Sequence, residues 1–252
     1  MGSLDNRQSA ERRHGLDNGE TAGEIVRRPI SDVAPAKQIE PSALEYQLLT
    51  PGRTRADDPR IVEAYRCWRA TWCDAFVELK QRTELFSDDF SRQHEIGALF
   101  QHDECIALSF FRWVDLSVPM NRDDSYFRVW PEQAKNDACR EGSLICVSSS
   151  FTLAAGYRRS NVCSLKDVLV ALIIERFLAS DADAVVGTVR NNRGVDKLIY
   201  RNGFLPILHN RQMYGVDVDL GAFYRRGCTR TPTSPINEHI VQALRPKAGG
   251  AL

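Results

Sequence analysis

One stretch of the chain combines three features that together favour binding of an anion. An apolar strand is expected over 143–152, and a polar loop with two adjacent arginines, Arg158 and Arg159, follows it. Ser164 then marks the start of a helix, with Asp167 three residues later as in an approximate capping box. Free backbone N–H groups and the helix dipole favour a phosphate there, and arginines add charge-assisted hydrogen bonds. The alternative is a pair of surface arginines beside an ordinary helix cap.

The elements around this loop predict a single α/β domain over 43–226. The pattern predicts, in order, a strand over 43–49, an amphipathic helix over 57–80, a hairpin over 95–115, the strand and helix around the basic loop, a strand over 184–189, a short helix over 193–202 and two strands over 204–208 and 212–220. Gly203 is expected to close the short helix in a left-handed conformation. This order predicts one mixed sheet of about six to seven strands with flanking helices and one crossover.

The two ends of the 252-residue chain differ from this domain in composition. Residues 1–42 are polar, charged and punctuated by proline, which predicts a disordered leader. Residues 227–252 contain further prolines and glycines and predict a flexible C-terminal tail, apart from a short helix around 238–244. About 180 residues remain for the folded domain, enough to bury a sizeable core.

The overall composition excludes several classes of protein. Lys+Arg and Asp+Glu both number 33, so the formal net charge is zero, which argues against a general nucleic-acid binder. No apolar run approaches the roughly 20 residues of a membrane span, and the N-terminus has no apolar stretch typical of a secretory signal. Seven cysteines without a Cys-x-x-Cys pair indicate reduced thiols in a cytoplasmic protein. We expect no metal site, because the spacing of His94, His102 and Cys105 matches no compact ligand set.

Between 143 and 204 the sequence resembles the GNAT N-acyltransferase superfamily. The family's pyrophosphate loop, Arg/Gln-x-x-Gly-x-Gly/Ala, corresponds to Arg158-Arg159-Ser160-Asn161-Val162-Cys163. Its helix with a tyrosine shortly before Gly-Phe corresponds to Tyr200-Arg201-Asn202-Gly203-Phe204. The long segment before residue 143 and the ending over 213–220 look most like the branch of N-acyl amino acid synthases and acyl-homoserine-lactone synthases, which take acyl groups from acyl-carrier proteins.

The resemblance implies a GNAT-like single domain that acts as an N-acyltransferase. It would move an acyl group of medium or long chain from an acyl-CoA or an acyl-phosphopantetheine on a carrier protein. The acceptor would be the amine of an amino acid or similar small molecule, with no nucleic acid, metal or membrane span involved. Two alternatives stay open: an acetyl-CoA-dependent N-acetyltransferase, and a catalytically degenerate GNAT-fold binding protein.

The resemblance also implies roles for particular residues. The donor would contact Val147 and Ser148 on the strand, the loop from Arg158 through Arg159, Ser160, Asn161, Val162 and Cys163 to Ser164, and Asn191 and Asn192 after strand 184–189. Tyr200 is the first candidate for the acid that protonates the leaving thiolate, with Cys163 and Ser149 behind it. Glu95, Glu104 and Glu141 are candidates for the base that deprotonates the amine.

Two departures from the family pattern bear on these roles. Asn161 and Cys163 stand where the family has small residues, which predicts weaker binding of a CoA pyrophosphate. A carrier-protein pantetheine lacks the nucleotide, so it would be affected less. Tyr200 lies three residues before Gly203 where the family has four, and one residue turns a helical side chain by about 100°. Unless the helix is one residue shorter, Tyr200 points elsewhere.

Overall fold

The computed structural model describes residues 36–52, 58–78, 85–213 and 215–245. The short helices among them are η1 (Pro41–Ala43), α2 (Asp88–Ser91), α3 (Pro119–Arg122), α4 (Glu132–Ala138), η2 (Ala155–Tyr157) and η3 (Asn191–Arg193). The longer or site-forming helices are α1 (Pro59–Glu78), α5 (Leu165–Leu178), α6 (Val195–Arg201) and α7 (Pro235–Leu244). The strands are β1 (Leu44–Leu49), β2 (Glu95–Gln101), β3 (Glu104–Asp115), β4 (Leu144–Leu153), β5 (Ala184–Arg190), β6 (Leu205–Met213) and β7 (Val216–Tyr224).

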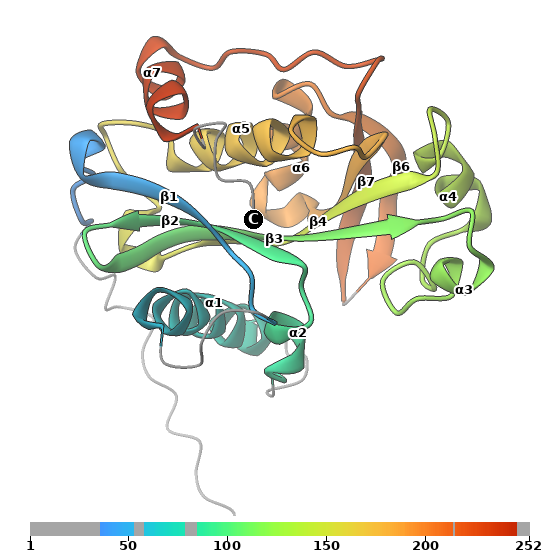
Figure 1. Ribbon diagram of the computed structural model, residues 1–252, viewed down its shortest axis with the longest axis horizontal. Coiled ribbons are helices and arrows are strands. Elements are labelled where there is room, and N and C mark those ends of the chain that lie inside the picture. Colours follow the sequence, from blue (N-terminus) through green and yellow to red (C-terminus); the bar gives the residue numbers. More distant parts are fainter. Residues whose placement is uncertain (1–35, 53–57, 79–84, 214, 246–252) are drawn as a thin grey trace, which may run out of the picture. The chain divides into compact units, whose positions relative to one another are not determined.

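These strands form one mixed sheet of seven, in the order β1-β2-β3-β4-β5-β7-β6. Only β4 and β5 pair in parallel, and α5 makes the crossover between them. Helices α5, α6 and α7 cover one face of the sheet, while α1, α2 and α3 lie on the other (Figure 1). Helix α4 packs on the side opposite α5, where Ala134 and Ala138 cluster with Ile145 and Val147 of β4. The structure thus confirms the predicted mixed sheet with flanking helices and a single crossover.

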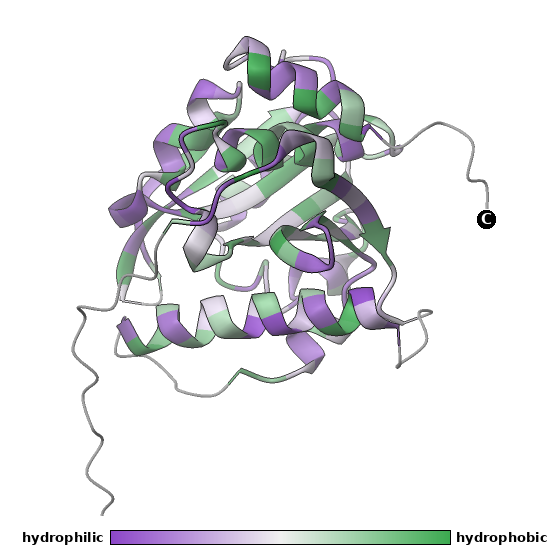
Figure 2. Cartoon of the chain, turned by 90° about the vertical axis from the view of Figure 1, so that its left-hand side faces the viewer, coloured by the Kyte–Doolittle hydropathy of each residue, from purple (hydrophilic) through white to green (hydrophobic). Residues whose placement is uncertain are grey.

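Helix α5 is buried around most of its circumference, because the sheet lies on one side of it and α7 on the other. Every residue from Val168 to Ile174 is buried. A helix that is hydrophobic all round needs partners on more than one side. Helix α1 is different: Figure 2 shows hydrophilic and hydrophobic bands alternating along it, and its buried residues, Ala64, Cys67 and Trp68, face the β2–β3 hairpin.

The C-terminal segment contributes to this core. We expected a flexible tail over 227–252, and the described part of it instead contains α7, which buries Ile240, Val241 and Leu244. The physical reason is the apolar outer side of α5, which needs a cover. At the other end of the chain, residues 1–35 of the expected leader lie outside the described residues, whereas Ile39 is buried in the same core.

The closing hairpin differs from the prediction in one detail. The sequence predicts two strands over 204–208 and 212–220, but β6 runs from Leu205 to Met213 without a break at 209–211, and the chain turns at Gly215 (φ 73°). Asn210 has a φ of 52° and lies where the β6–β7 register shifts, so its left-handed conformation makes a bulge inside the strand. Gly203 does close α6 with a positive φ of 101°, as predicted.

The cover that α7 provides can be tested with two isoleucines of the same helix. Ile240 is 2% exposed and Ile236 is 41% exposed. We expect Ile240→Ala to lower the free energy of unfolding by about 2–4 kcal/mol, since it opens a cavity under α7. The matched Ile236→Ala should cost under about 1 kcal/mol. Urea denaturation measures both, and equal effects would contradict the placement of α7 in the core.

Candidate active site

The parallel pairing of β4 with β5 stops after three residue pairs. The paired positions are Ile145 with Ala184, Cys146 with Val185, and Val147 with Val186. Beyond them β4 stays paired with β3 as far as Leu153, and β5 stays paired with β7 as far as Arg190. The two strands therefore separate, and a cavity of about 370 Å³ lies where they part.

A bulge in β4 lies at this point of separation. Two residues of β4, Ser150 and Phe151, face a single residue of β3 between the pairs Leu108–Thr152 and Phe110–Ser149. Ser150 adopts a φ of 52°, which is uncommon outside glycine. A bulge bends its strand and increases the local twist. We attribute the divergence of β4 from β5 to this bend.

Side-chain hydrogen bonds from β3, β4 and α1 hold the bulge. Thr152 Oγ1 donates to the carbonyl oxygen of Ser150 at 2.6 Å. Ser109 Oγ donates to the carbonyl oxygen of Ser149 at 3.2 Å and lies 3.0 Å from Ser148 Oγ. Trp72 Nε1, from α1, donates to Thr152 Oγ1 at 3.0 Å and so ties α1 to the same bulge. Hydrogen bonds to these carbonyls fix the direction of the neighbouring peptide groups.

The walls of the cavity come from α1, β4, α5, β5, η3 and α6, with Arg158 of the basic loop. Trp72 of α1 and Phe151 of β4 contribute to its apolar part. Further large apolar side chains come from α5, β5, α6 and the strand start after α6: Val170, Ile173, Val186, Val189, Leu198, Ile199 and Phe204. The charged part has four cations and two anions: Arg158, Lys166, Arg190 and Arg193, with Asp74 and Glu78. An apolar cleft with a few convergent charged groups is the usual form of a small-molecule site.

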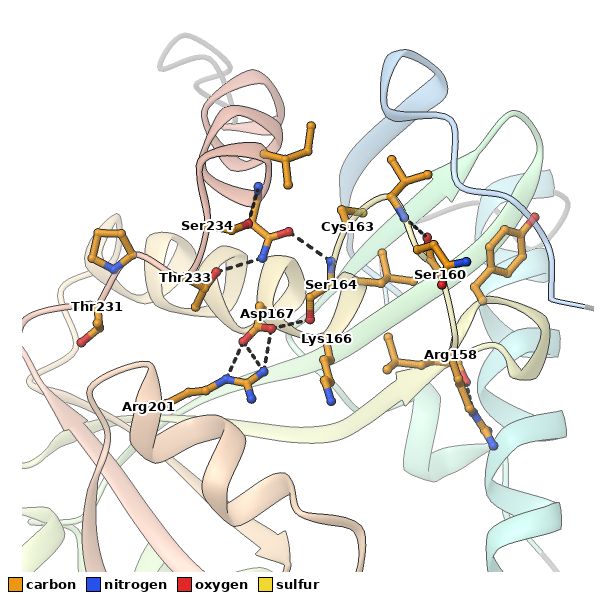
Figure 3. Close-up of a pocket in the computed structure, with 18 residues that line it drawn as sticks. Arg158, Ser160, Cys163, Ser164, Lys166, Asp167, Arg201, Thr231, Thr233 and Ser234 are labelled. Carbon is orange, nitrogen blue, oxygen red and sulfur yellow. Dashed lines mark hydrogen bonds and ion pairs between the residues drawn. The ribbon is translucent and has the colours of Figure 1, made fainter.

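A second cavity, of about 760 Å³, adjoins the first and shares Leu153, Arg158 and Lys166 with it. The basic loop forms one wall, and the segment 231–237 before and within α7 forms the other. Figure 3 shows Arg158 and Lys166 projecting from the loop and the start of α5 on the side away from α7. The two basic side chains therefore stand at the junction of the cavities.

The N-terminus of α5 is held by side chains from α6 and α7. Ser164 Oγ donates to the Asp167 carboxylate in a short hydrogen bond, and Arg201 pairs with the same carboxylate at 2.6 Å (Figure 3). Asn237 Oδ1 accepts from the Ser164 N–H at 3.1 Å. Burial alone would raise the pKa of Asp167, but the bonds from Arg201, Ser164 and Asn202 lower it. These contacts fix the geometry of the loop that precedes the helix.

The structure brings many of the predicted donor-site residues together. Ser148 and Ser149 line the first cavity. Ser160, Asn161, Val162, Cys163 and Ser164 line the second, and Arg158 lines both. Val147 is buried and is the last residue of β4 that pairs with β5. Neither Val147 nor Arg159 lines a described cavity. Burial raises the pKa of the Cys163 thiol, which argues against a nucleophilic thiolate there.

Asn191 and Asn192 lie beside the first cavity and support its residues. Asn191 Nδ2 donates to Asp219 Oδ1 at 2.8 Å, and Asn192 Oδ1 accepts from Arg190 Nε at 3.2 Å. Neither asparagine is among the lining residues. Their polar groups hold the end of β5 in place.

Tyr200 does not line the cavity; its neighbour Ile199 does. Helix α6 keeps its full length, so the one-residue shift turns Tyr200 onto β7, where its hydroxyl donates to Asp219 Oδ2 at 2.6 Å. Asp219 also accepts from the Asn210 N–H at 2.9 Å and lies 2.8 Å from His209 Nδ1. Burial and the hydrogen bond to Asp219 raise the pKa of Tyr200. This tyrosine is part of a partly buried polar network around the buried Asp219.

The three candidate base residues are likewise engaged elsewhere. Glu95 pairs with Arg176 through two hydrogen bonds of 2.7 and 2.9 Å. Glu104 accepts from Lys37 and Tyr157, and Glu141 accepts from the Arg226 N–H. None of the three lines either described cavity.

The carboxylates that do face the first cavity, Asp74 and Glu78, come from α1. With Thr71 they recur at three- and four-residue steps, so they form one polar stripe on the helix. This spacing can be read in the sequence of the amphipathic helix predicted over 57–80. Glu78 forms an ion pair with Arg193, which links α1 to the turn before α6. No local pattern in the sequence marks Arg190 or the segment 231–237 as site residues, because only the fold brings them to the cavities.

In the described part of the chain, no group of three or more His, Cys, Asp or Glu side chains could hold a metal ion. All seven cysteines are free thiols. None of the helices in the described ranges has the length and apolarity that crossing a bilayer requires.

The network around Asp219 predicts a specific dependence of stability on pH. Burial opposes ionisation, yet hydrogen bonds from Tyr200, Asn210, Asn191 and His209 lower the pKa of Asp219 to about 2. An unfolded-chain aspartate titrates near 3.9. Ionised Asp219 therefore stabilises the fold above that pH, by about 2 kcal/mol, and this contribution is lost as the pH falls toward 2.

We expect Asp219→Asn to lower the free energy of unfolding at pH 7 by about 2–4 kcal/mol and to remove about 2 kcal/mol of its change between pH 5 and 2. The control is Asp217→Asn, an exposed site on the same strand, which should change stability by under about 0.5 kcal/mol. Urea denaturation at several pH values measures both. A wild-type pH slope in Asp219→Asn would contradict the assignment.

No protein-family profile matches the sequence, and no curated protein matches it. Solved structures do match. FeeM, an N-acyl amino acid synthase from uncultured soil microbes, is 13% identical with a TM-score of 0.50, over 72% of this chain and 89% of FeeM. BjaI, a CoA-dependent acyl-homoserine lactone synthase with SAM and isopentyl-CoA bound, is 11% identical with a TM-score of 0.53, over 80% of this chain and 89% of BjaI.

The AHL synthase LasI is 14% identical with a TM-score of 0.50, over 72% of this chain and 89% of LasI. At these identities the likeness concerns the fold. The seven-stranded mixed sheet, its single parallel pair and the matches to these synthases agree with the resemblance in the sequence. The chain therefore has the GNAT-like acyltransferase fold.

Proposed function

We propose that the protein is an N-acyltransferase that moves a medium- or long-chain acyl group from a phosphopantetheine thioester to the amine of an amino acid or similar small molecule. The donor is an acyl-carrier protein or an acyl-CoA. The observation that carries this proposal is the opening between β4 and β5 directly beside a basic loop at the N-terminus of α5. The likeness of the fold to acyl-donor-dependent synthases supports it.

The opening suits a pantetheine arm. Where β4 and β5 separate, their facing edges lose the strand partner that they have up to Val147 and Val186. An extended arm with two amide groups can hydrogen bond to such strand edges. Its phosphate would then lie near Arg158, Lys166 and the N-terminus of α5, where charge and helix dipole both favour an anion. The apolar side chains that α5, β5 and α6 contribute to the cavity provide the surface for the acyl chain.

The transfer forms a C–N bond and breaks a C–S bond at one carbonyl carbon. The amine must first lose a proton, and Asp74 is the carboxylate at the cavity that can accept it, since Glu78 is paired with Arg193. The tetrahedral oxyanion needs backbone N–H donors, for which the bulge at Ser150 is the best-placed part of the chain. The leaving thiolate takes up a proton, and Ser149 is the predicted acid that lines the cavity. Tyr200 and Glu95 act in this proposal as framework residues.

A direct test measures acyl transfer by mass spectrometry from acetyl-CoA, longer acyl-CoAs and acyl-carrier proteins to a panel of amines, together with the melting temperature with each donor. A ligand at 100 times its Kd adds about 2.7 kcal/mol, which is roughly 5–10 °C for this domain. Transfer that improves with chain length supports the proposal. Transfer of acetyl groups alone would favour the N-acetyltransferase alternative. Donor binding without transfer, or no shift with any donor, would favour the degenerate binding protein.

Lys166 provides a sharper test of the donor position. We expect Lys166→Gln to raise the Kd of an acyl-phosphopantetheine by about tenfold, because it removes a charge-assisted contact to the phosphate. The control is Lys197→Gln, an exposed lysine on α6 that lines neither described cavity. Isothermal titration calorimetry measures both. Equal Kd values for the two variants would place the phosphate elsewhere.

A further inference from the structure

Arg190 is a cation of the first cavity that forms no ion pair with a carboxylate in the described part of the chain. It ends β5 and lines the cavity. Its Nε donates to Asn192 Oδ1 at 3.2 Å, while its Nη2 is buried and has no hydrogen-bond partner in the described part of the chain. A buried guanidinium nitrogen without an acceptor is costly, and an anion beside it recovers that cost.

The neighbouring charges increase this imbalance. Glu78 of α1 is the carboxylate whose charge acts on Arg190, but it is already paired with Arg193. Burial and the charge of Arg193 lower the pKa of Arg190, and only Glu78 opposes them. The whole lining has four cations against two anions. The site is thus short of negative charge at the end of β5.

Arg190 lies on the face of the sheet that α1 covers, whereas the basic loop leads into α5 on the other face. Val189 packs into the core under α5 and α6, whereas Thr188 bonds to Tyr126 on the opposite face at 3.3 Å. Since successive strand residues point to opposite faces, Arg190 shares the face of Thr188. That face is the one covered by α1 with Asp74 and Glu78. Arg158 and Lys166 are left for the phosphate of the donor.

We propose that Arg190 binds the carboxylate of the acceptor and thereby selects amines that carry an acidic group. This inference rests on the proposed function and assigns the residue that recognises the acceptor. The arrangement can bind both charged groups of a zwitterion: Asp74 attracts its ammonium group, and Arg190 attracts its carboxylate. An amine without the acid would leave Arg190 unpaired inside the complex, so the site rejects it.

The test compares an α-amino acid with its carboxamide, which keeps the amine and side chain but removes the negative charge. For each variant we take the ratio of kcat/KM for the amino acid to that for the carboxamide, so that the different amine pKa values of the two compounds cancel between variants. We expect Arg190→Gln to reduce the wild-type ratio by about 100-fold. Arg190→Lys should reduce it less, since it keeps the charge but loses the bidentate geometry.

Arg211→Gln is the matched control, because it removes an exposed arginine of β6 that lines neither described cavity. Its ratio should equal that of the wild type. An unchanged ratio in Arg190→Gln would overturn the assignment while leaving the acyltransferase proposal intact. Melting temperatures of all variants separate this result from loss of folding.

A binding measurement keeps the inference testable if no acyl transfer is found. Calorimetry of the wild type with the amino acid in the presence of CoA should show binding that Arg190→Gln weakens at least tenfold and Arg211→Gln leaves unchanged. That result supports the acid-binding role of Arg190 even where transfer, and with it the proposed function, fails. Wild-type protein that binds neither the amino acid nor its carboxamide, or binds both equally, overturns the inference.

Discussion

The parallel strands β4 and β5 stop hydrogen bonding to each other before either strand ends. Beyond that point, the backbone groups on their facing edges border a gap. In this chain the cause is local: one extra residue of β4, with Ser150 in a left-handed conformation, bends the strand away from β5. The bend needs support, because an unsupported left-handed serine costs free energy. Ser109, Thr152 and Trp72 provide this support from three different elements. The cavity exists because these contacts hold the two strands apart.

The helix that crosses between the separated strands is fixed at both ends. At its N-terminus, Asn237 and Arg201 bond to Ser164 and Asp167. At its C-terminus, the guanidinium of Arg225 donates to backbone carbonyls that include that of Phe177. Both Arg225 and Asn237 belong to the chain after β7, so the C-terminal segment holds α5 from end to end. The same segment forms the outer wall of the larger cavity beside the basic loop.

The shifted tyrosine illustrates how a single residue can change a role without changing the fold. Tyr200 lies on the same helix as the tyrosine of the family pattern, but one residue closer to Gly203. This step turns its side chain by about 100° about the helix axis, so its hydroxyl bonds to Asp219 and does not face the cavity. There it joins Asn191, Asn210 and His209 in a network that joins the end of β5 to β6 and β7. Ile199 fills the vacated place and adds apolar surface to the cavity. Proton transfer in the proposed reaction therefore relies on α1 and β4.

The order of the elements follows from local patterns in the sequence, because hydrophobic periodicity and capping residues act over a few neighbours. The helix after Ser164, the strand from Ala184 and the left-handed Gly203 all follow from such local signals. The basic loop and its position at a helix N-terminus were readable for the same reason. Local signals failed at Asn210, where a strand bulge and a turn use the same left-handed conformation. Which polar and charged residues meet depends on the folding of the whole domain, since Asp74, Arg190 and Asn237 come from distant elements. Their placement depends on the bend in β4 and on the apolar outer side of α5, and both effects act between segments that are far apart in the chain.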